Sequence, residues 1–161
     1  NESFVVILAD DLISGNSIMK NMIESYTQGN MMAIMEVEKN EVSSYGIITP
    51  GKIANRIYEI NEMVEKPLPQ NAPSQLAIVG RYILDSKIFD ILSKQRRGSG
   101  NEIQLTDAIS ELIGSSPCYG YKFDEERFDC GSKLGFIQAN ISLALKRSEL
   151  VGLKNWLKKI V

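Results

Sequence analysis

The apolar residues of this chain are grouped into short segments with the spacing of strands and helices. The first segment, Ser3–Ala9, contains a continuous apolar run that stops at Asp10. A run without polar interruptions predicts a strand that is buried on both faces of a parallel sheet. Because this strand begins almost at Asn1, we expect its neighbouring strands to come from sequence upstream of the chain.

A helix and a second strand are predicted next. Apolar residues recur three and four positions apart in Asn16–Gln28, with Ser14 or Asn16 as the cap and Gly29 at the end. Met31–Val37 is again uniformly apolar. The chain therefore begins with a strand–helix–strand unit.

The remaining sequence predicts the same mixture of elements. Rough alternation on both sides of Pro50-Gly51 indicates an antiparallel hairpin, and three prolines mark an extended loop after it. The further elements are a strand at Leu76–Leu84, a helix at Ser86–Lys94, a flexible connection at Arg96–Gly100, a helix from the cap Thr106 to Ile113, a strand at Cys118–Phe123, and helices at Lys133–Arg147 and Leu150–Ile160. The pattern is that of an α/β protein with a mixed sheet.

Composition limits the class of protein. The chain has 161 residues, the usual size of one domain, and a formal net charge of -2. This charge gives no electrostatic reason to expect nucleic acid or an anionic membrane as a partner. No apolar run reaches the ~20 residues that cross a bilayer, and two cysteines are too few for a secreted disulfide framework. We therefore expect a cytoplasmic protein.

The sequence contains no histidine. Ser-His-Asp and Cys-His nucleophilic catalysis are excluded within this chain, and so is a zinc site with histidine ligands. Any chemistry has to use carboxylates, lysine, arginine, tyrosine, a metal ion or positioning alone. Nucleotidyl transfer is compatible with these limits, because it depends on metal and lysine electrostatics more than on proton transfer.

The first apolar run ends at a pair of acids, Asp10 and Asp11. In open α/β sheets ligands bind beyond the carboxyl ends of the strands, so an acid at this position can hold a hard cation. The alternative interpretation is that one of the two acids only caps the following turn.

Glu65, Lys66 and Pro67 stand at the end of another predicted strand. A carboxylate can accept hydrogen bonds from neighbouring sugar hydroxyls, and an ammonium group can neutralise a phosphate. Adjacent side chains start on opposite faces of a strand, so the chain would have to twist at Pro67 before the two could converge. A solvated loop is the alternative.

Two later segments combine acids with the start of a helix. We interpret Glu102–Asp107 as a capping region. Asp129 lies beside Cys130 and Gly131 just before a predicted helix, where it can be a second metal ligand or an N-cap-like turn residue.

The order of these segments is more specific than any one of them. It comprises Asp10 after the first strand, Tyr45-Gly46, Glu65-Lys66-Pro67, Ala77–Tyr82, Glu102–Asp107 and Asp129-Cys130-Gly131. This order resembles that of the bacterial UTP–glucose-1-phosphate uridylyltransferases, within the wider family of sugar nucleotidyltransferases. The resemblance runs from Asn1 to the last predicted helix near Trp156.

The resemblance implies a Rossmann-like mixed sheet of the nucleotidyltransferase type, incomplete because the N-terminal βα units are missing. Residues 1–161 would be the C-terminal portion of a single nucleotidyltransferase domain, ending in helices at 132–160. The glycine-rich signature of the family, which grips the nucleotide, is absent from this sequence. We therefore interpret the chain as part of an enzyme, inactive by itself.

The resemblance also assigns roles to individual positions. Asp10 and Asp129 match the two aspartates that hold Mg²⁺, Glu65 matches the residue that binds the glucose hydroxyls, and Lys66 the one that contacts the sugar phosphate. Further matches are Gly46, whose backbone lies against the sugar, and Ile78, Val79 and Gly80, which form a wall of the sugar pocket. Asp11 receives no role.

The implied enzyme transfers UMP from UTP to glucose 1-phosphate and releases UDP-glucose and pyrophosphate. The resemblance further implies a homo-oligomer that associates through its C-terminal helices. Two other functions remain open: a non-catalytic module that binds sugar phosphate or nucleotide sugar, or mediates an interaction, and a metal-dependent phosphohydrolase. The phosphohydrolase would need additional acidic ligands, which the sequence does not place.

Overall fold

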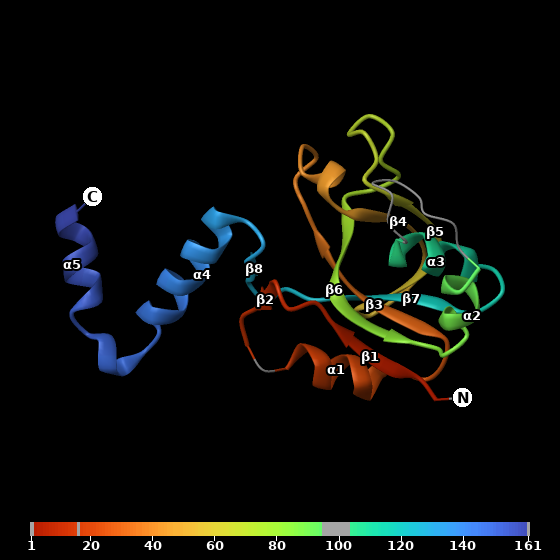
Figure 1. The fold of residues 1–161 in the computed structure, drawn as a ribbon, viewed down its shortest axis with the longest axis horizontal. Helices are drawn as coiled ribbons and strands as arrows, with labels where there is room; N and C mark the ends of the chain where they lie inside the picture. Colours follow the sequence, from red (N-terminus) through yellow and green to blue (C-terminus); the bar gives the residue numbers. More distant parts are fainter. Residues whose placement is uncertain (1, 16, 95–103, 161) are drawn as a thin grey trace. The chain divides into compact units, whose positions relative to one another are not determined.

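The computed structural model describes residues 2–15, 17–94 and 104–160. Contacts divide the chain into two compact units, the first formed by residues 1–8 and 16–124 and the second by residues 9–15 and 125–161. The predicted connection at Arg96–Gly100 lies outside the described residues, and so do the predicted cap Asn16 and the first two residues of the predicted capping region Glu102–Asp107. Figure 1 shows the strands and helices of both units.

The first unit is built on one mixed sheet. Its strands follow the order β1 (Phe4–Ile7), β6 (Leu76–Leu84), β3 (Asn30–Glu36), β7 (Cys118–Lys122), β5 (Ile57–Glu65) and β4 (Gly46–Ala54). Only β3 and β7 pair in parallel. Strand β4 also pairs with β6, at Ile47 and Ala77. The five strands β6, β3, β7, β5 and β4 therefore form a closed ring of pairings, which leaves out β1.

Short helices cover this sheet and complete its core. They are α1 (Ile18–Ser25), the 3-10 turn η1 (Val42–Ser44), α2 (Ile88–Leu92) and α3 (Leu105–Leu112). Side chains of α2 and α3 pack with the inward-facing residues of the strands in one apolar cluster. Asn30 is a polar residue that is fully buried in this unit. Its side-chain carbonyl oxygen accepts a hydrogen bond from the Asp85 N–H, and its amide nitrogen donates to the Cys118 sulfur.

Strand β1 differs from the expectation of a parallel strand covered on both faces. It is the terminal strand of the sheet order and pairs antiparallel with β6. Only alternate side chains are partly covered, while Val5 and Ile7 remain exposed. The strand–helix–strand unit is present in a modified form, because β1 and β3 run in the same direction with β6 between them.

Two local predictions were also wrong. Pro50-Gly51 does not form the hairpin turn but lies inside β4, where irregular register accommodates a residue without an N–H. The turn falls at Asn55, whose φ of 56° is the left-handed conformation that asparagine tolerates.

Helix α3 begins at Leu105 after Gln104, so Thr106 lies within its first turn and is not its cap.

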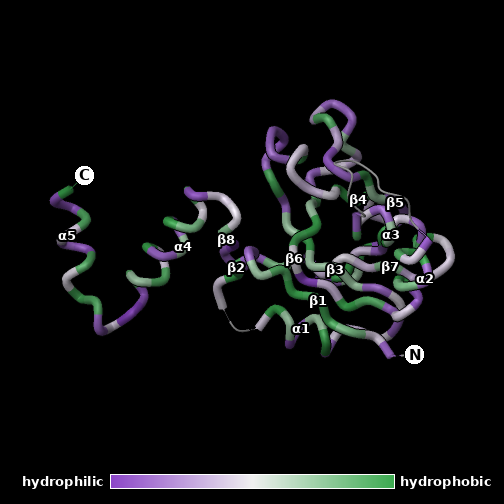
Figure 2. The backbone as a smooth tube through the Cα atoms, viewed as in Figure 1, coloured by the Kyte–Doolittle hydropathy of each residue, from purple (hydrophilic) through white to green (hydrophobic). Residues whose placement is uncertain are grey.

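The second unit contains a small antiparallel ribbon and helices. Strands β2 (Asp11–Ile13) and β8 (Arg127–Asp129) pair with each other, and α4 (Lys133–Leu145), η3 (Ser148–Leu150) and α5 (Leu153–Ile160) follow. Ser132 caps α4 by accepting a hydrogen bond from the Gly135 N–H at 3.0 Å. Large apolar side chains stay exposed along α4 and α5, including Phe136, Ile137, Trp156 and Ile160. Figure 2 shows that hydrophobic and hydrophilic residues are interspersed along both helices.

Within the described ranges, no helix has both the length and the apolar character that a bilayer crossing requires.

Two glycines of the first unit lead to contrasting stability predictions. A Cβ on Gly29 (φ 76°) would lie 2.2 Å from the Pro117 carbonyl oxygen, whereas a Cβ on Gly114 (φ 89°) meets no heavy atom within 4 Å. Gly114→Ala should lose only the ~1–2 kcal/mol of left-handed strain. Gly29→Ala adds a backbone collision and should lose roughly 3–5 kcal/mol. Urea unfolding of both variants checks this, and equal losses would contradict the packing of Gly29 against Pro117.

Candidate functional site

The predicted site residues that lie near strand ends form two groups, one in each unit. Gly46, Glu65 and Lys66 belong to the first unit, and Asp10 and Asp129 to the second.

The pairing of β4 with β5 places Gly46 directly opposite Glu65. A Cβ on Gly46 would lie 3.1 Å from the Glu65 Oε2 atom and 2.9 Å from the Thr106 methyl carbon. Only a residue without a Cβ fits into this narrow space between the Glu65 carboxylate and Thr106. Thr106 borders the same space from α3, a contact that sequence reasoning missed because its only signal was a helix start.

The Glu65 carboxylate is held in a nearly closed environment. Its side chain is 19% exposed, and its Oε2 atom is buried with no hydrogen-bond partner among the described residues. Leaving a buried acceptor unpaired costs about 1–3 kcal/mol, and more for a charged group. Such an oxygen marks a position where a ligand that donates hydrogen bonds gains binding energy.

Lys66 converges on Glu65 through an unusual backbone conformation. Its φ is 46°, in the left-handed region that side chains other than glycine rarely adopt, and its N–H donates to the Tyr45 carbonyl at 2.9 Å. The Lys66 Nζ atom then lies 3.7 Å from Glu65 Oε1, with 58% of its side chain exposed. Backbone strain of this kind is concentrated at functional sites, and here it brings together two side chains that start on opposite faces.

Ile78, Val79 and Gly80 lie in the middle of β6. Ile78 and Val79 are buried, and Ile78 belongs to the main apolar core. The Gly80 carbonyl accepts hydrogen bonds from the Leu8 N–H at 2.9 Å and from the Arg81 guanidinium at 2.8 Å. Their contribution to a sugar pocket stays a prediction.

In the second unit the β2–β8 ribbon brings Asp10 and Asp129 together. Asp11 pairs with Asp129 across the ribbon, and the Cys130 N–H donates to the Asp10 carbonyl at 2.7 Å. A Cβ on Gly131 would lie 3.1 Å from both Asp10 Oδ2 and Asp129 Oδ1. The two carboxylate oxygens are therefore separated by no more than twice that distance and face the same space.

The start of α4 fixes the backbone of Asp129. The Ser132 hydroxyl donates to the Asp129 carbonyl at 3.0 Å, and the Gly131 N–H donates to its Oδ1 atom at 3.0 Å. A Cβ on Gly135 would lie 2.1 Å from the same carbonyl oxygen. The helix can approach Asp129 this closely only because Gly135 has no side chain.

The Asp10 and Asp129 pair fits a hard divalent cation. Carboxylate oxygens are the ligands that Mg²⁺ prefers, and Mg²⁺ usually keeps water or phosphate in its other positions. No group of three or more His, Cys, Asp or Glu side chains suited to a metal occurs in the part of the chain that the structure describes. Two protein carboxylates are within the number that Mg²⁺ usually takes from a protein when substrate phosphates complete its coordination.

The ribbon contains a buried ion pair that sequence reasoning did not anticipate. The side chains of Asp11 and Arg127 are in direct contact and only 8% and 10% exposed. Asp11 thus has a structural partner, although the sequence suggested no role for it. Its location next to Asp10, and opposite Asp129, makes the pair part of the framework that holds the two carboxylates.

Removing one partner of this pair should loosen the ribbon. Arg127→Met leaves the Asp11 charge buried without its guanidinium and should cost roughly 3–5 kcal/mol, whereas the double variant Asp11→Leu/Arg127→Met should recover most of it. The exposed Arg147–Glu149 pair offers a control, because Arg147→Met should change stability by less than about 1 kcal/mol. Thermal unfolding of the wild type and the three variants measures these changes in stability. An Arg127→Met variant as stable as Arg147→Met would show that the Asp11–Arg127 pair does not stabilise the protein.

Comparisons with known proteins agree with the resemblance seen in the sequence. The family model described as nucleotidyl transferase matches residues 1–145. The UTP–glucose-1-phosphate uridylyltransferase of Streptococcus pyogenes is 43% identical over 169 residues, covering 99% of this chain and 56% of the relative. A second relative of that name, from Staphylococcus saprophyticus, is 46% identical over 149 residues, covering 91% of this chain and 52% of its own length.

Solved structures show the same relationship. A UDP-glucose pyrophosphorylase complexed with UDP-glucose superposes with a TM-score of 0.83 at 42% identity, over 91% of this chain and 58% of that chain. A UTP-bound enzyme from Acinetobacter baumannii gives a TM-score of 0.81 at 30% identity, over 99% of this chain and 57% of that chain. The predicted α/β fold of the nucleotidyltransferase type is confirmed, and this chain spans about half the length of the curated relatives it matches.

Proposed function

The chain belongs to the nucleotidyl transferase family, and from this premise we propose that it supplies the sugar-binding and metal-binding side of a UTP–glucose-1-phosphate uridylyltransferase. The complete enzyme transfers UMP from UTP to glucose 1-phosphate and releases UDP-glucose and pyrophosphate. Two observations on relatives support these substrates, since one solved structure holds UDP-glucose and another holds UTP.

The observation that carries the proposal is the buried Oε2 atom of Glu65. It has no hydrogen-bond partner among the described residues, and Gly46 packs directly beside it. Neighbouring hydroxyls of a glucose ring offer the donors that this carboxylate lacks. A sugar held there would present its phosphate to the Lys66 ammonium group, which lies within 3.7 Å of the same carboxylate.

The reaction needs little proton chemistry from the protein. A phosphate oxygen of glucose 1-phosphate attacks the α-phosphorus of UTP, a new P–O bond forms, and the bond to the β-phosphate oxygen breaks to release pyrophosphate. The attacking oxygen is already anionic at neutral pH, so no general base is required and the absence of histidine has no cost. Lys66 reduces the repulsion between the sugar phosphate and the triphosphate.

Asp10 and Asp129 are the residues that would hold Mg²⁺. When bound, Mg²⁺ neutralises the negative charge that builds on the phosphate oxygens. Asp129 is oriented for this role by the Gly131 N–H and the Ser132 hydroxyl, and Asp10 by its backbone link to Cys130. These bonds hold the carboxylates in place before the cation arrives, as preorganised electrostatic sites require.

The nucleotide has to be bound largely by the part of the relatives that this chain does not match. We therefore expect the 161-residue chain alone to release pyrophosphate from UTP and glucose 1-phosphate only at the background rate. A chimera that fuses the unmatched part of the Streptococcus pyogenes relative ahead of Asn1 should be active. An inactive but folded chimera that still binds sugar phosphate would favour the alternative of a non-catalytic binding module.

Glu65→Gln in this chimera tests sugar recognition. The amide keeps the shape of the side chain but removes the charge, and charge-assisted hydrogen bonds contribute roughly 1.5–3 kcal/mol. Affinity for glucose 1-phosphate should fall about tenfold to a hundredfold, while affinity for UTP hardly changes. Isothermal titration with each substrate separates the two effects, and an equal loss for both would assign Glu65 a structural role.

The complete protein is further proposed to be a cytoplasmic homo-oligomer. The exposed apolar residues of α4 and α5, among them Leu134, Phe136 and Trp156, are suited to association between copies.

A further inference from the structure

A cavity lies in the first unit, at one end of the ring of strands. Its volume is about 590 Å³, and none of its lining residues belongs to the Glu65 cluster. The parallel strands β3 and β7 contribute Glu36 and Lys122 from their carboxyl ends, and the antiparallel strands β5 and β6 contribute Tyr58 and Leu76 from near their starts. The mouth of a closed sheet and the carboxyl ends of parallel strands are both places where small ligands bind.

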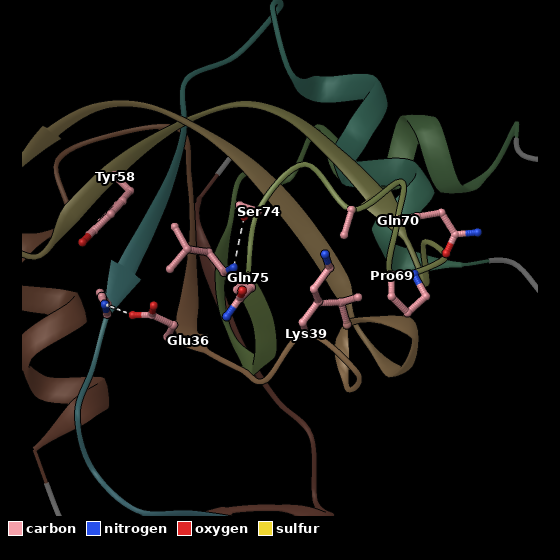
Figure 3. Close-up of a pocket in the computed structure, with 11 residues that line it drawn as sticks. Glu36, Lys39, Tyr58, Pro69, Gln70, Ser74 and Gln75 are labelled. Atoms are coloured by element: carbon pink, nitrogen blue, oxygen red, sulfur yellow. Dashed lines mark hydrogen bonds and ion pairs between the residues drawn. The ribbon is translucent and has the colours of Figure 1, made fainter.

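The charged side chains that line this cavity are Lys39, Lys122 and Glu36, so their sum is positive although the chain has a formal net charge of -2. Lys122 Nζ lies 2.8 Å from Glu36 Oε2, and this bond raises the pKa of Lys122 and lowers that of Glu36, so both stay charged at neutral pH. Lys39 is exposed, and its ammonium group forms no hydrogen bond or ion pair with another described residue. In Figure 3 it lies between Glu36 and Tyr58 on one side and Pro69 and Gln70 on the other.

The segment Pro69–Gln75, between β5 and β6, forms the rim of the cavity. Hydrogen bonds of Ser74 and Gln75 hold this rim in place. The Ser74 hydroxyl donates to the Ile48 carbonyl at 2.6 Å and accepts from the Leu76 N–H at 3.0 Å. The Gln75 side-chain amide nitrogen donates to the Val37 carbonyl at 3.0 Å, and Gln75 lines the cavity. A rim that is ordered in advance reduces the entropy cost of binding.

We propose that this cavity, which we name the ring-mouth pocket, binds a phosphate monoester of a polyhydroxylated molecule, such as a sugar phosphate. Lys39 and Lys122 provide the positive charge for the phosphate group. Glu36 and the amides of Gln70 and Gln75 provide acceptors and donors for hydroxyls, and Tyr58 provides an apolar face beside the partly buried Leu76. The volume is within the usual 300–1,000 Å³ of small-molecule sites.

This site is separate from the glucose 1-phosphate site proposed above and does not depend on it. Lys66 precedes Pro69 of the rim by only three positions, so an experiment has to distinguish the two lysine sites directly. Substitutions at Lys39 and Lys66 do this, because each removes one ammonium group from one site.

The experiment is a titration of the ¹⁵N-labelled 161-residue chain with glucose 6-phosphate, followed by amide chemical shifts. We expect saturable changes at Glu36–Lys39 and Gln70–Leu76, with a dissociation constant in roughly the millimolar range or below. Inorganic phosphate and uncharged glucose are the reference probes. Each should bind at least about fivefold more weakly than glucose 6-phosphate, because inorganic phosphate lacks the sugar hydroxyls and glucose lacks the phosphate group.

Three variants locate the binding. Lys39→Gln should weaken binding of glucose 6-phosphate roughly tenfold. Lys66→Gln and the exposed control Lys87→Gln should leave it within about twofold. Loss of binding in Lys66→Gln but not in Lys39→Gln would overturn the ring-mouth proposal and leave the proposed function intact.

Two other results would also overturn it. Inorganic phosphate that binds as tightly as glucose 6-phosphate would show a bare anion site, and the absence of saturation up to about 20 mM ligand would show no site at all.

Discussion

Asp129→Asn in the active chimera should lower kcat/KM by roughly a hundredfold to a thousandfold, because a bound cation contributes several kcal/mol of charge stabilisation in such reactions. The substitution is nearly isosteric and removes the negative charge from one of the two oxygens that face the space beside Gly131. Pyrophosphate release measures the rate. Direct binding of Mn²⁺, followed by electron paramagnetic resonance, measures the site independently of turnover and should weaken by about tenfold or more.

Two further variants separate a metal role from general damage. Asp90→Asn makes the same chemical change at an exposed position in the first turn of α2 and should leave both rate and Mn²⁺ affinity unchanged. Gly131→Ala keeps both carboxylates but adds a methyl group 3.1 Å from an oxygen of each, so it should reduce Mn²⁺ binding without removing a ligand. Wild-type Mn²⁺ affinity in both Asp129→Asn and Gly131→Ala would rule out this pair as the metal site.

Lys66→Ala should lower kcat/KM for glucose 1-phosphate by about a hundredfold or more. A single electrostatic donor that acts on developing charge contributes ~2.7–4 kcal/mol, whereas a solvent-exposed ion pair contributes ~0–1 kcal/mol. The side chain is 58% exposed in the chain alone, so its importance depends on the phosphates that it contacts in the complete enzyme. Steady-state kinetics with each substrate varied in turn measures the change.

Matched substitutions test the same lysine in two ways. Lys66→Arg keeps the charge but changes its reach and hydrogen-bonding geometry, so its rate should fall between those of wild type and alanine. Lys52→Ala removes a similar charge from the exposed part of β4 and should have little effect. Melting temperature should change little in all three variants, and a near-wild-type rate for Lys66→Ala would return this lysine to the role of a solvated loop residue.

Much of the first unit could be predicted from periodicity because its strands are long enough to carry a pattern. Leu76–Leu84 was predicted with its observed bounds, and Met31–Val37 differs from β3 by one residue at each end. The hairpin turn was placed wrongly because Pro50-Gly51 is a strong turn signal that the sheet accommodates as an irregularity within β4. Periodicity also does not reveal partners, so the antiparallel pairing and terminal position of β1 came only with the structure.

The candidate site was accessible from sequence only through the order of its motifs. Glu65, Lys66, Asp10 and Asp129 were each ambiguous as isolated residues, and the family resemblance selected them together. Their chemistry could not be judged further, because neither the burial of Glu65 Oε2 nor the close packing of Gly46 against it can be read from the sequence pattern.

The sequence by itself determined the family, the α/β class and the kind of chemistry that a chain without histidine can support. Tertiary structure alone decided how the reactive side chains meet. The strands β2 and β8 have three residues each, too few to show a period, yet their pairing brings Asp10 and Asp129 together from distant parts of the chain. Lys66 reaches Glu65 only because the surrounding fold stabilises a left-handed backbone that local preference disfavours.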